Sequence, residues 1–356
     1  MELLCRCART RAAGPRRLGR AITVITYIAV VAPILGPVAG GLILAHLSWR
    51  AIFFLNVPIS LIAIYAAWRG MPDELQDARA VLDWPGLLLL SPAMAATIYA
   101  LTRVGSSGSL HSTSVLLPLG AGLALLAAFG LRERTAQAAP LLDLHLFRLR
   151  SFTVSTALLF LSGLALYGAM LLLPLYFQTV RGATALAAGL LLAPQGVGSL
   201  LTRWAGSLTD RIGPRPLVFA GMALAALGTV AFAVAGPATG SWLLGLSLVV
   251  RGAGLGAANI AILAGAYQGI APREIPHASL ATRIVQQVGG AFGTAVLAMV
   301  LVSQPGMRAG APLAGRALVF AVAFRWSVGF ALLGAALALA LPRRRAMPSA
   351  GGDRNM

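Results

Sequence analysis

The sequence contains no lysine, and all 28 of its basic residues are arginine. Because alanine and glycine are also abundant, this uniformity indicates a GC-rich coding bias, to which we attach no mechanism. Charged residues make up only 11% of the chain, against about 25% in soluble domains. With 58% hydrophobic residues and a mean hydropathy of +0.83, the composition excludes a water-soluble protein of this length and indicates a membrane protein.

Cysteine is nearly absent as well, since Cys5 and Cys7 are the only two. Thiols one residue apart form a poor disulfide pair and provide too few ligands for zinc. The sequence also has no paired acids, nucleophile triad, phosphate-binding loop or metal-ligand cluster. We therefore expect a protein that is not an enzyme and that binds no cofactor or metal.

The 28 arginines outnumber the ten acidic residues, which leaves a net charge of +18. A charge of this size is compatible with nucleic-acid binding. In a membrane protein, however, basic residues gather on the cytoplasmic loops. We therefore expect the lipid bilayer as a partner and no nucleic acid.

Long apolar runs fill most of the chain, and runs near twenty residues bounded by charge, Pro or Gly predict spanning helices. We count ten of them, so that both termini lie on one side of the membrane. They are Ala21–Leu47, Ala51–Trp68, Trp84–Thr102, Val115–Leu131, Phe152–Val180, Leu186–Ala205, Leu217–Ala235, Trp242–Ala266, Ile284–Val302 and Ala317–Leu341.

The arginines give the orientation of these spans. If both termini are cytoplasmic, 20 of the 28 arginines lie on the cytoplasmic side, 5 on the outer side and 3 within spans. This asymmetry follows the positive-inside rule. The first apolar run is too long for a signal peptide and ends in no small-residue cleavage site, so we interpret it as a membrane helix. The expected location is the cell membrane of a bacterium.

Helix-breaking residues cluster in the stretch APILGPVAGG at positions 32–41. Gly36 and Gly40 lie four residues apart on one helix face, and small residues at this spacing allow two membrane helices to approach closely. Pro37 removes a backbone donor and leaves a carbonyl to be satisfied by a neighbour or water. Taken alone, the spacing favours generic helix packing over a functional role.

This stretch and its continuation resemble the major facilitator superfamily, in particular its fourteen-helix drug:proton antiporter branch (EmrB/QacA type). That branch carries a GPxxGG signature in its fifth helix and a W-R-x-x-F-x-x-N-x-P stretch leading into the sixth. The matching residues are Gly36, Pro37, Gly40 and Gly41, followed by Trp49, Arg50, Phe53, Asn56 and Pro58. Ala32 stands where the family usually has a further glycine.

A second motif, GSLTDRIGPRP at positions 206–216, resembles the charged cytoplasmic loop of the superfamily. The resemblance implies that this loop gates the cytoplasmic side through charge pairing. The plainer interpretation is an ordinary charged turn. The residues that the resemblance assigns to gating are Gly206, Asp210, Arg211, Gly213 and Arg215, while Pro214 replaces an expected basic residue.

Polar residues within the predicted spans are costly and therefore informative. Arg251, Asn259, Gln286 and Gln287 are the candidates for a transport path, with helix-packing contacts as the alternative. None of the ten acidic residues falls inside a span. A carboxylate that carries protons at membrane depth is thus missing from these spans.

The expected fold is an all-α polytopic bundle of the major facilitator type with about ten transmembrane helices. Because the first matching helix resembles the family's fifth, the resemblance implies that the first four helices are lacking. The implied division is a basic segment at 1–20, two helices of the first bundle at 21–69, two linking helices at 70–131, a linker at 132–151, a six-helix bundle at 152–341 and a tail at 342–356.

The function implied by the resemblance is proton-coupled export of small, drug-like or amphipathic compounds. Its partners are then the bilayer, a small-molecule substrate and protons. Two alternatives stay open: a truncated remnant that transports nothing, and a major facilitator carrier for another small solute. The sequence does not identify the substrate.

Overall fold

The computed structural model describes residues 36, 39–43, 46–48, 50–70, 84–107, 112–135, 144–236, 238–271, 274–304, 306 and 312–342. The described part is helical and contains no strand. The structure thus has the all-α architecture that the hydropathy pattern predicts.

Before the linker region, the structure describes the full extent of α3 (Arg50–Gly70), α4 (Trp84–Ser107) and α5 (Thr113–Thr135). A short 3-10 helix, η2 (Leu144–Arg148), then leads into α6 (Arg150–Thr179). The remaining elements are α7 (Ala185–Leu200), the 3-10 helix η3 (Leu201–Trp204), α8 (Ala205–Ile212), α9 (Pro214–Val234), α10 (Ser241–Ala266), α11 (Ile275–Ser303) and α12 (Leu313–Ala338).

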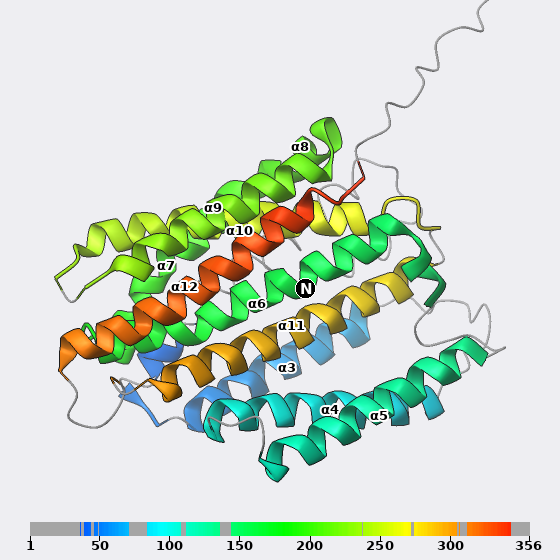
Figure 1. Ribbon diagram of the computed structural model, residues 1–356, viewed down its shortest axis with the longest axis horizontal. Coiled ribbons are helices and arrows are strands. Elements are labelled where there is room, and N and C mark those ends of the chain that lie inside the picture. Colours follow the sequence, from blue (N-terminus) through cyan, green and yellow to red (C-terminus); the bar gives the residue numbers. More distant parts are fainter. Residues whose placement is uncertain are drawn as a thin grey trace, which may run out of the picture.

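Helix α6 is the hub of the larger group of helices, since it packs against α7, α10, α11 and α12. Helix α9 packs against α10 and α12, and α10 also packs against α7. The antiparallel pair α4 and α5 joins this block through contacts between α4 and α11 (Figure 1). Helix α3 makes no extensive contact with another described helix.

Within the described residues, seven helices are long and apolar enough to cross a membrane: α4, α5, α6, α9, α10, α11 and α12. Two of the other predicted spans fall on the shorter apolar helices Arg50–Ala66 and Ala185–Leu200. Most of the remaining predicted span, Ala21–Leu47, which is the first along the chain, lies outside the described residues. The total of ten spans therefore stays a prediction.

Two predicted boundaries are wrong. The span expected over 186–205 is not one α-helix, because α7 ends at Leu200 and the chain continues as the 3-10 helix η3 before α8 begins at Ala205. The span expected to begin at Ile284 is part of a helix that begins at Ile275, nine residues earlier. Pro276 stands in the first turn of that helix, where proline is favoured because no backbone donor is needed there. Hydropathy alone misses this polar first part of α11.

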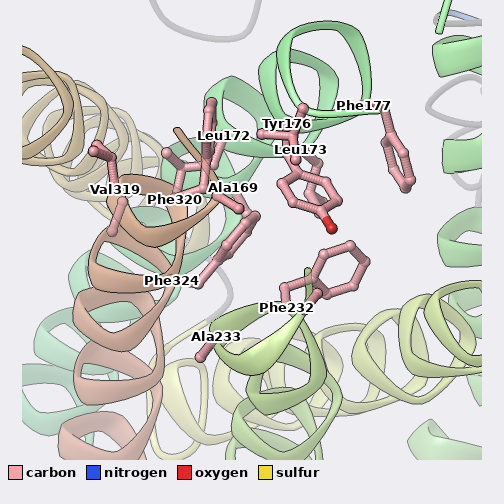
Figure 2. Packing of buried hydrophobic residues seen from close by; sticks show 14 of the residues in the cluster. Ala169, Leu172, Leu173, Tyr176, Phe177, Phe232, Ala233, Val319, Phe320 and Phe324 are labelled. Atoms are coloured by element: carbon pink, nitrogen blue, oxygen red, sulfur yellow. The ribbon is translucent and has the colours of Figure 1, made fainter. Parts of the chain in front are cut away.

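An aromatic cluster joins α6, α9 and α12 at one end of the block (Figure 2). The Tyr176 ring is fully buried, and its centroid lies 5.9 Å from that of Phe232, 5.8 Å from Phe320 and 6.0 Å from Phe324. All three contacts are edge-on, the geometry that aromatic pairs favour. The Tyr176 hydroxyl donates a hydrogen bond to the Gly236 carbonyl at 3.3 Å.

Arg181 connects two loops at the same end of the block through hydrogen bonds. Its guanidinium donates to the Ser241 hydroxyl at 2.9 Å and to the Thr239 carbonyl. The loop between α6 and α7 is thereby fixed to the start of α10. This end of the block is held by rings and side-chain hydrogen bonds.

Candidate functional site

A buried arginine lies in the middle of the block. Arg251 on α10 is 1% exposed, and its Nη1 donates to Oε1 of Gln195 on α7 at 2.7 Å. Its Nη2 donates to the backbone carbonyl of Ala165 on α6 at 2.7 Å. The guanidinium therefore joins three helices. Both partners are neutral, although a buried charge is normally paired with an opposite one.

A second polar group lies further along the same helix. Oδ1 of Asn259 accepts hydrogen bonds from Oγ of Ser162 on α6 at 3.1 Å and from Nε2 of Gln286 on α11 at 2.9 Å. Nδ2 of Asn259 donates to the Leu255 carbonyl at 2.9 Å. Gln287, in contrast, is exposed and does not join this group.

The five side chains form what we call the polar ladder, defined as Gln195, Arg251, Ser162, Asn259 and Gln286. It crosses α7, α10, α6 and α11. Arg251 and Ser162 are buried, whereas the three amide side chains are partly exposed. Hydrogen-bonded polar groups in an apolar bundle are expensive to place and mark candidate sites for function.

Three members of the ladder, Arg251, Asn259 and Gln286, stand out in the sequence as polar residues within predicted spans, whereas Gln195 and Ser162 do not. Gln195 gives a usable signal, since it is the only side chain in α7 that carries an amide and it follows Pro194 directly. Ser162 gives none, because serine is common in membrane helices and its role depends on which helix face meets α10. Gln287 was expected beside Gln286, but consecutive helical residues point in different directions.

Glycines beside the ladder allow its helices to approach. A Cβ added at Gly252, next to Arg251, would overlap the backbone carbonyl of Gln195. A Cβ added at Gly163, next to Ser162, would overlap the backbone carbonyl of Gln286. Each hydrogen-bonded pair therefore sits beside a close backbone contact, in agreement with the role of small residues in membrane helix packing.

The GPxxGG stretch is only partly described, and Pro37 lies outside the described residues. A Cβ added at Gly36 or Gly40 would meet no heavy atom of the described residues within 4 Å. At Gly41, however, it would lie 2.7 Å from Cα of Leu186 and 2.9 Å from the carbonyl of Ala185. Within the described part, the close helix approach expected for Gly36 and Gly40 is therefore found at Gly41, against the start of α7.

The stretch from 206 to 216 differs from the tight turn that we expected. Gly206, Asp210 and Arg211 belong to α8, and the chain turns at Gly213, where φ is +86°. Only glycine adopts this φ without strain, and Pro214 then begins α9. Arg211 is exposed and Arg215 is half-buried, while the side chain of Asp210 lies outside the described part. The gating role of these residues stays a prediction.

Residues 5–294 match the sequence model of the Major Facilitator Superfamily. The chain is 36% identical, over 297 residues, to "Multidrug resistance protein B homolog" of Mycobacterium tuberculosis, covering 83% of this chain and 55% of that protein. It is 30% identical, over 294 residues, to "Lincomycin resistance protein LmrB" of Listeria monocytogenes, covering 80% of this chain and 60% of that protein. The chain thus spans somewhat more than half the length of these curated relatives.

The solved structure of the nucleoside transporter NupG superposes with a TM-score of 0.45 and 17% sequence identity. The superposition covers 94% of this chain and 88% of NupG. This similarity is too low to support an argument about the chain.

Proposed function

Because the chain belongs to the major facilitator superfamily, we propose that it acts in the export of small, amphipathic compounds across a bacterial cell membrane. The names of two relatives, a multidrug resistance protein and a lincomycin resistance protein, support this class of substrate. The proposed partners are the bilayer, the transported compound and protons.

The polar ladder is the observation that carries the proposal. Ligand sites in membrane carriers lie at the level of the bilayer midplane and use a few polar groups within apolar walls. Arg251 lies near the middle of α10, and the partly exposed amides of Gln195, Asn259 and Gln286 lie on three different helices. A compound at this level can therefore form hydrogen bonds with several helices at once.

In the proposed mechanism, two helical bundles rock about this level and expose it alternately to the two sides. Gly36, Pro37, Gly40 and Gly41 set the packing and bend of the helix that carries the antiporter signature. Asp210, Arg211 and Arg215 act at the cytoplasmic gate. The block at 152–341 contributes one bundle, and 21–69 and 70–131 contribute helices of the other bundle and of the link between them.

Proton coupling is the finer part of the proposal. Helices α6, α7, α9, α10, α11 and α12 contain no Asp or Glu. We therefore place any proton-carrying carboxylate outside these six helices.

The experiment uses the purified chain in liposomes with an imposed pH gradient. Three fluorescent probes are followed: neutral N-phenyl-1-naphthylamine, anionic 8-anilinonaphthalene-1-sulfonate and cationic ethidium. We expect gradient-dependent movement of at least one probe, and its loss when nigericin collapses the gradient. An Asp210→Asn variant that inserts normally is expected to move the probe more slowly. Rates equal to those of empty liposomes for all three probes would contradict the function and favour the remnant without transport activity.

The proposed orientation places both termini in the cytoplasm and is tested in intact cells. After Cys5 and Cys7 are replaced by serine, a single cysteine is introduced at Ser112, which is half-buried, or at Gln268, which is exposed. A membrane-impermeant thiol reagent is expected to label the first position from outside and the second only after lysis. The reverse pattern would overturn the orientation.

A further inference from the structure

The charge at Arg251 has no acidic partner in the helices that surround it. Its two hydrogen-bond acceptors are an amide oxygen and a backbone carbonyl. The helices that bear them, α7 and α6, contain no Asp or Glu, and neither do α9, α10, α11 and α12. Arginine stays protonated in proteins, so this block holds a permanent positive charge in its interior.

Gln195 is the partner that can be exchanged. The Ala165 carbonyl belongs to the backbone of α6 and stays in place, whereas Gln195 has a rotatable and partly exposed side chain. Its neighbour Pro194 removes one backbone hydrogen bond from α7. The amide oxygen of Gln195 thus occupies, at 2.7 Å, a position that a stronger acceptor from outside could take.

A charged oxygen acceptor binds a guanidinium more strongly than an amide oxygen does, and it can bind in a bidentate manner. A cationic group at the same place would meet an uncompensated like charge in a region of low dielectric constant. The site therefore distinguishes ligands by the sign of their charge, and not only by their hydrophobicity.

We propose that Arg251 and Gln195 form a head-group subsite for an anionic group, a carboxylate or a sulfonate, of an amphipathic compound. The anion replaces Oε1 of Gln195 at Nη1 of Arg251, and the released amide of Gln195 donates its N–H to the same anion. The apolar part of the compound lies along the neighbouring side chains of α7, Leu191 and Leu192, which are half-buried. This inference rests on the proposed function and adds the substrate class.

The test measures equilibrium binding to the purified full chain in a neutral maltoside detergent, without any gradient. Three probes share one naphthalene body and differ in the head group: 1-naphthaleneacetate, 1-naphthaleneacetamide and protonated 1-naphthylethylamine. We expect the acetate to bind at least tenfold more tightly than the amide, and the amine to bind most weakly. Equal affinities of the acetate and the amide for the unmodified chain would overturn the proposal.

Variants separate a binding role from a purely structural one. In Arg251→Gln the preference for the acetate is expected to disappear. In Arg325→Gln, which removes the same charge from an exposed position on α12, the preference is expected to remain. A loss of preference in both variants would show that general surface charge attracts the acetate, and it would overturn the subsite.

Gln195→Glu provides a second test that does not depend on whether Arg251→Gln folds. It places a carboxylate where the amide oxygen lies now, so the fold is expected to be at least as stable, while acetate binding is expected to fall at least tenfold because the arginine is already neutralised. Gln195→Met leaves the charge free but removes the N–H donor, so the preference for the acetate is expected to be smaller than in the unmodified chain and larger than in Gln195→Glu. Unchanged acetate binding in Gln195→Glu would overturn the proposal. None of these results depends on transport, so the liposome experiment and this one can fail independently.

Discussion

The most apolar 18-residue stretches of helices α5 and α6 have the same mean hydropathy, yet 61% of that stretch is buried inside the protein in α6 and only 17% in α5. The two differ in their partners, since α6 packs against four other helices and α5 chiefly against α4. Hydropathy thus decides whether a helix belongs in a bilayer, and it does not decide which helices pair there. Lipid tails are as apolar as leucine, so pairing requires close packing and hydrogen bonds.

Glycine accounts for much of the difference. On the α6–α11 interface, Cβ atoms added at Gly163, Gly289 or Gly293 would overlap backbone atoms of the facing helix. On α5, Cβ atoms added at Gly120 or Gly130 would meet nothing within 4 Å, and only Gly122 faces α4 closely. The same residue type therefore forms an interface in one region and an open surface in the other.

The largest effect is expected from Gly289→Leu. The added side chain meets the backbone of Phe160, which cannot move aside like a rotamer. We therefore expect the free energy of unfolding to fall by more than the about 1–3 kcal/mol that is usual for overpacked cores. The measurement is the fraction of folded, monodisperse protein after detergent extraction, together with its melting temperature. Gly120→Leu on α5 is the matched control and is expected to behave like the unmodified chain; similar losses in both would refute the contrast.

The aromatic cluster gives the next largest effect. Phe324 is fully buried, and its ring centroid lies 5.2 Å from that of Phe232. We expect Phe324→Ala to cost about 3 kcal/mol, the lower end of the range for buried phenylalanine, because the unfolded side chain remains in an apolar medium. Leu117→Ala on α5, where leucine is 75% exposed, is expected to change little. Unfolding by added SDS measures both, and an equal cost at the two positions would remove the distinction.

Hydrogen bonds between helices sharpen the comparison further. Asn259→Leu leaves Ser162 and Gln286 without their shared acceptor, and we expect a cost of about 1–2 kcal/mol. Thr97→Val on α4 removes a bond that runs to Ala93 within one helix, so a smaller loss is expected. The same unfolding assay ranks the two variants. A larger loss for Thr97→Val would mean that the ladder adds little to stability.

The smallest effect concerns the start of a helix. Oγ1 of Thr184 accepts a hydrogen bond from the Ala187 amide at the beginning of α7. Thr184→Ala is expected to cost about 1 kcal/mol or less. Ser112 precedes α5, where its hydroxyl bonds to that of Ser114 instead. Ser112→Ala should therefore leave the melting temperature nearly unchanged, and a drop as large as that of Thr184→Ala would show that capping does not differ between the two regions.

The sequence predicts the helices well and their contacts poorly. Nine predicted spans fall on helices of the structure, because long apolar runs leave the backbone no other way to satisfy its hydrogen bonds in a bilayer. The 3-10 segment after Leu200 and the polar start of α11 escape hydropathy, since both depend on local backbone geometry and not on how apolar the residues are. Asn259 and Gln286 are evident as costly residues, whereas Ser162 and Gln195 become relevant only once the facing helices are known. The roles proposed for them stay predictions.

The glycine contacts have a consequence for genetics. A substitution at Gly289 collides with the main chain of Phe160, so no change of a facing side chain can relieve it, and second-site suppressors are not expected on α6. At the next residue the situation is different, because a Cβ at Gly290 meets the ring of Tyr167, 2.5 Å from its Cδ2. A smaller residue at position 167 can relieve that collision. Substitutions at these two adjacent glycines therefore differ in their expected suppressors. For Gly289 we expect none on the facing helix, and for Gly290 we expect a smaller residue in place of Tyr167.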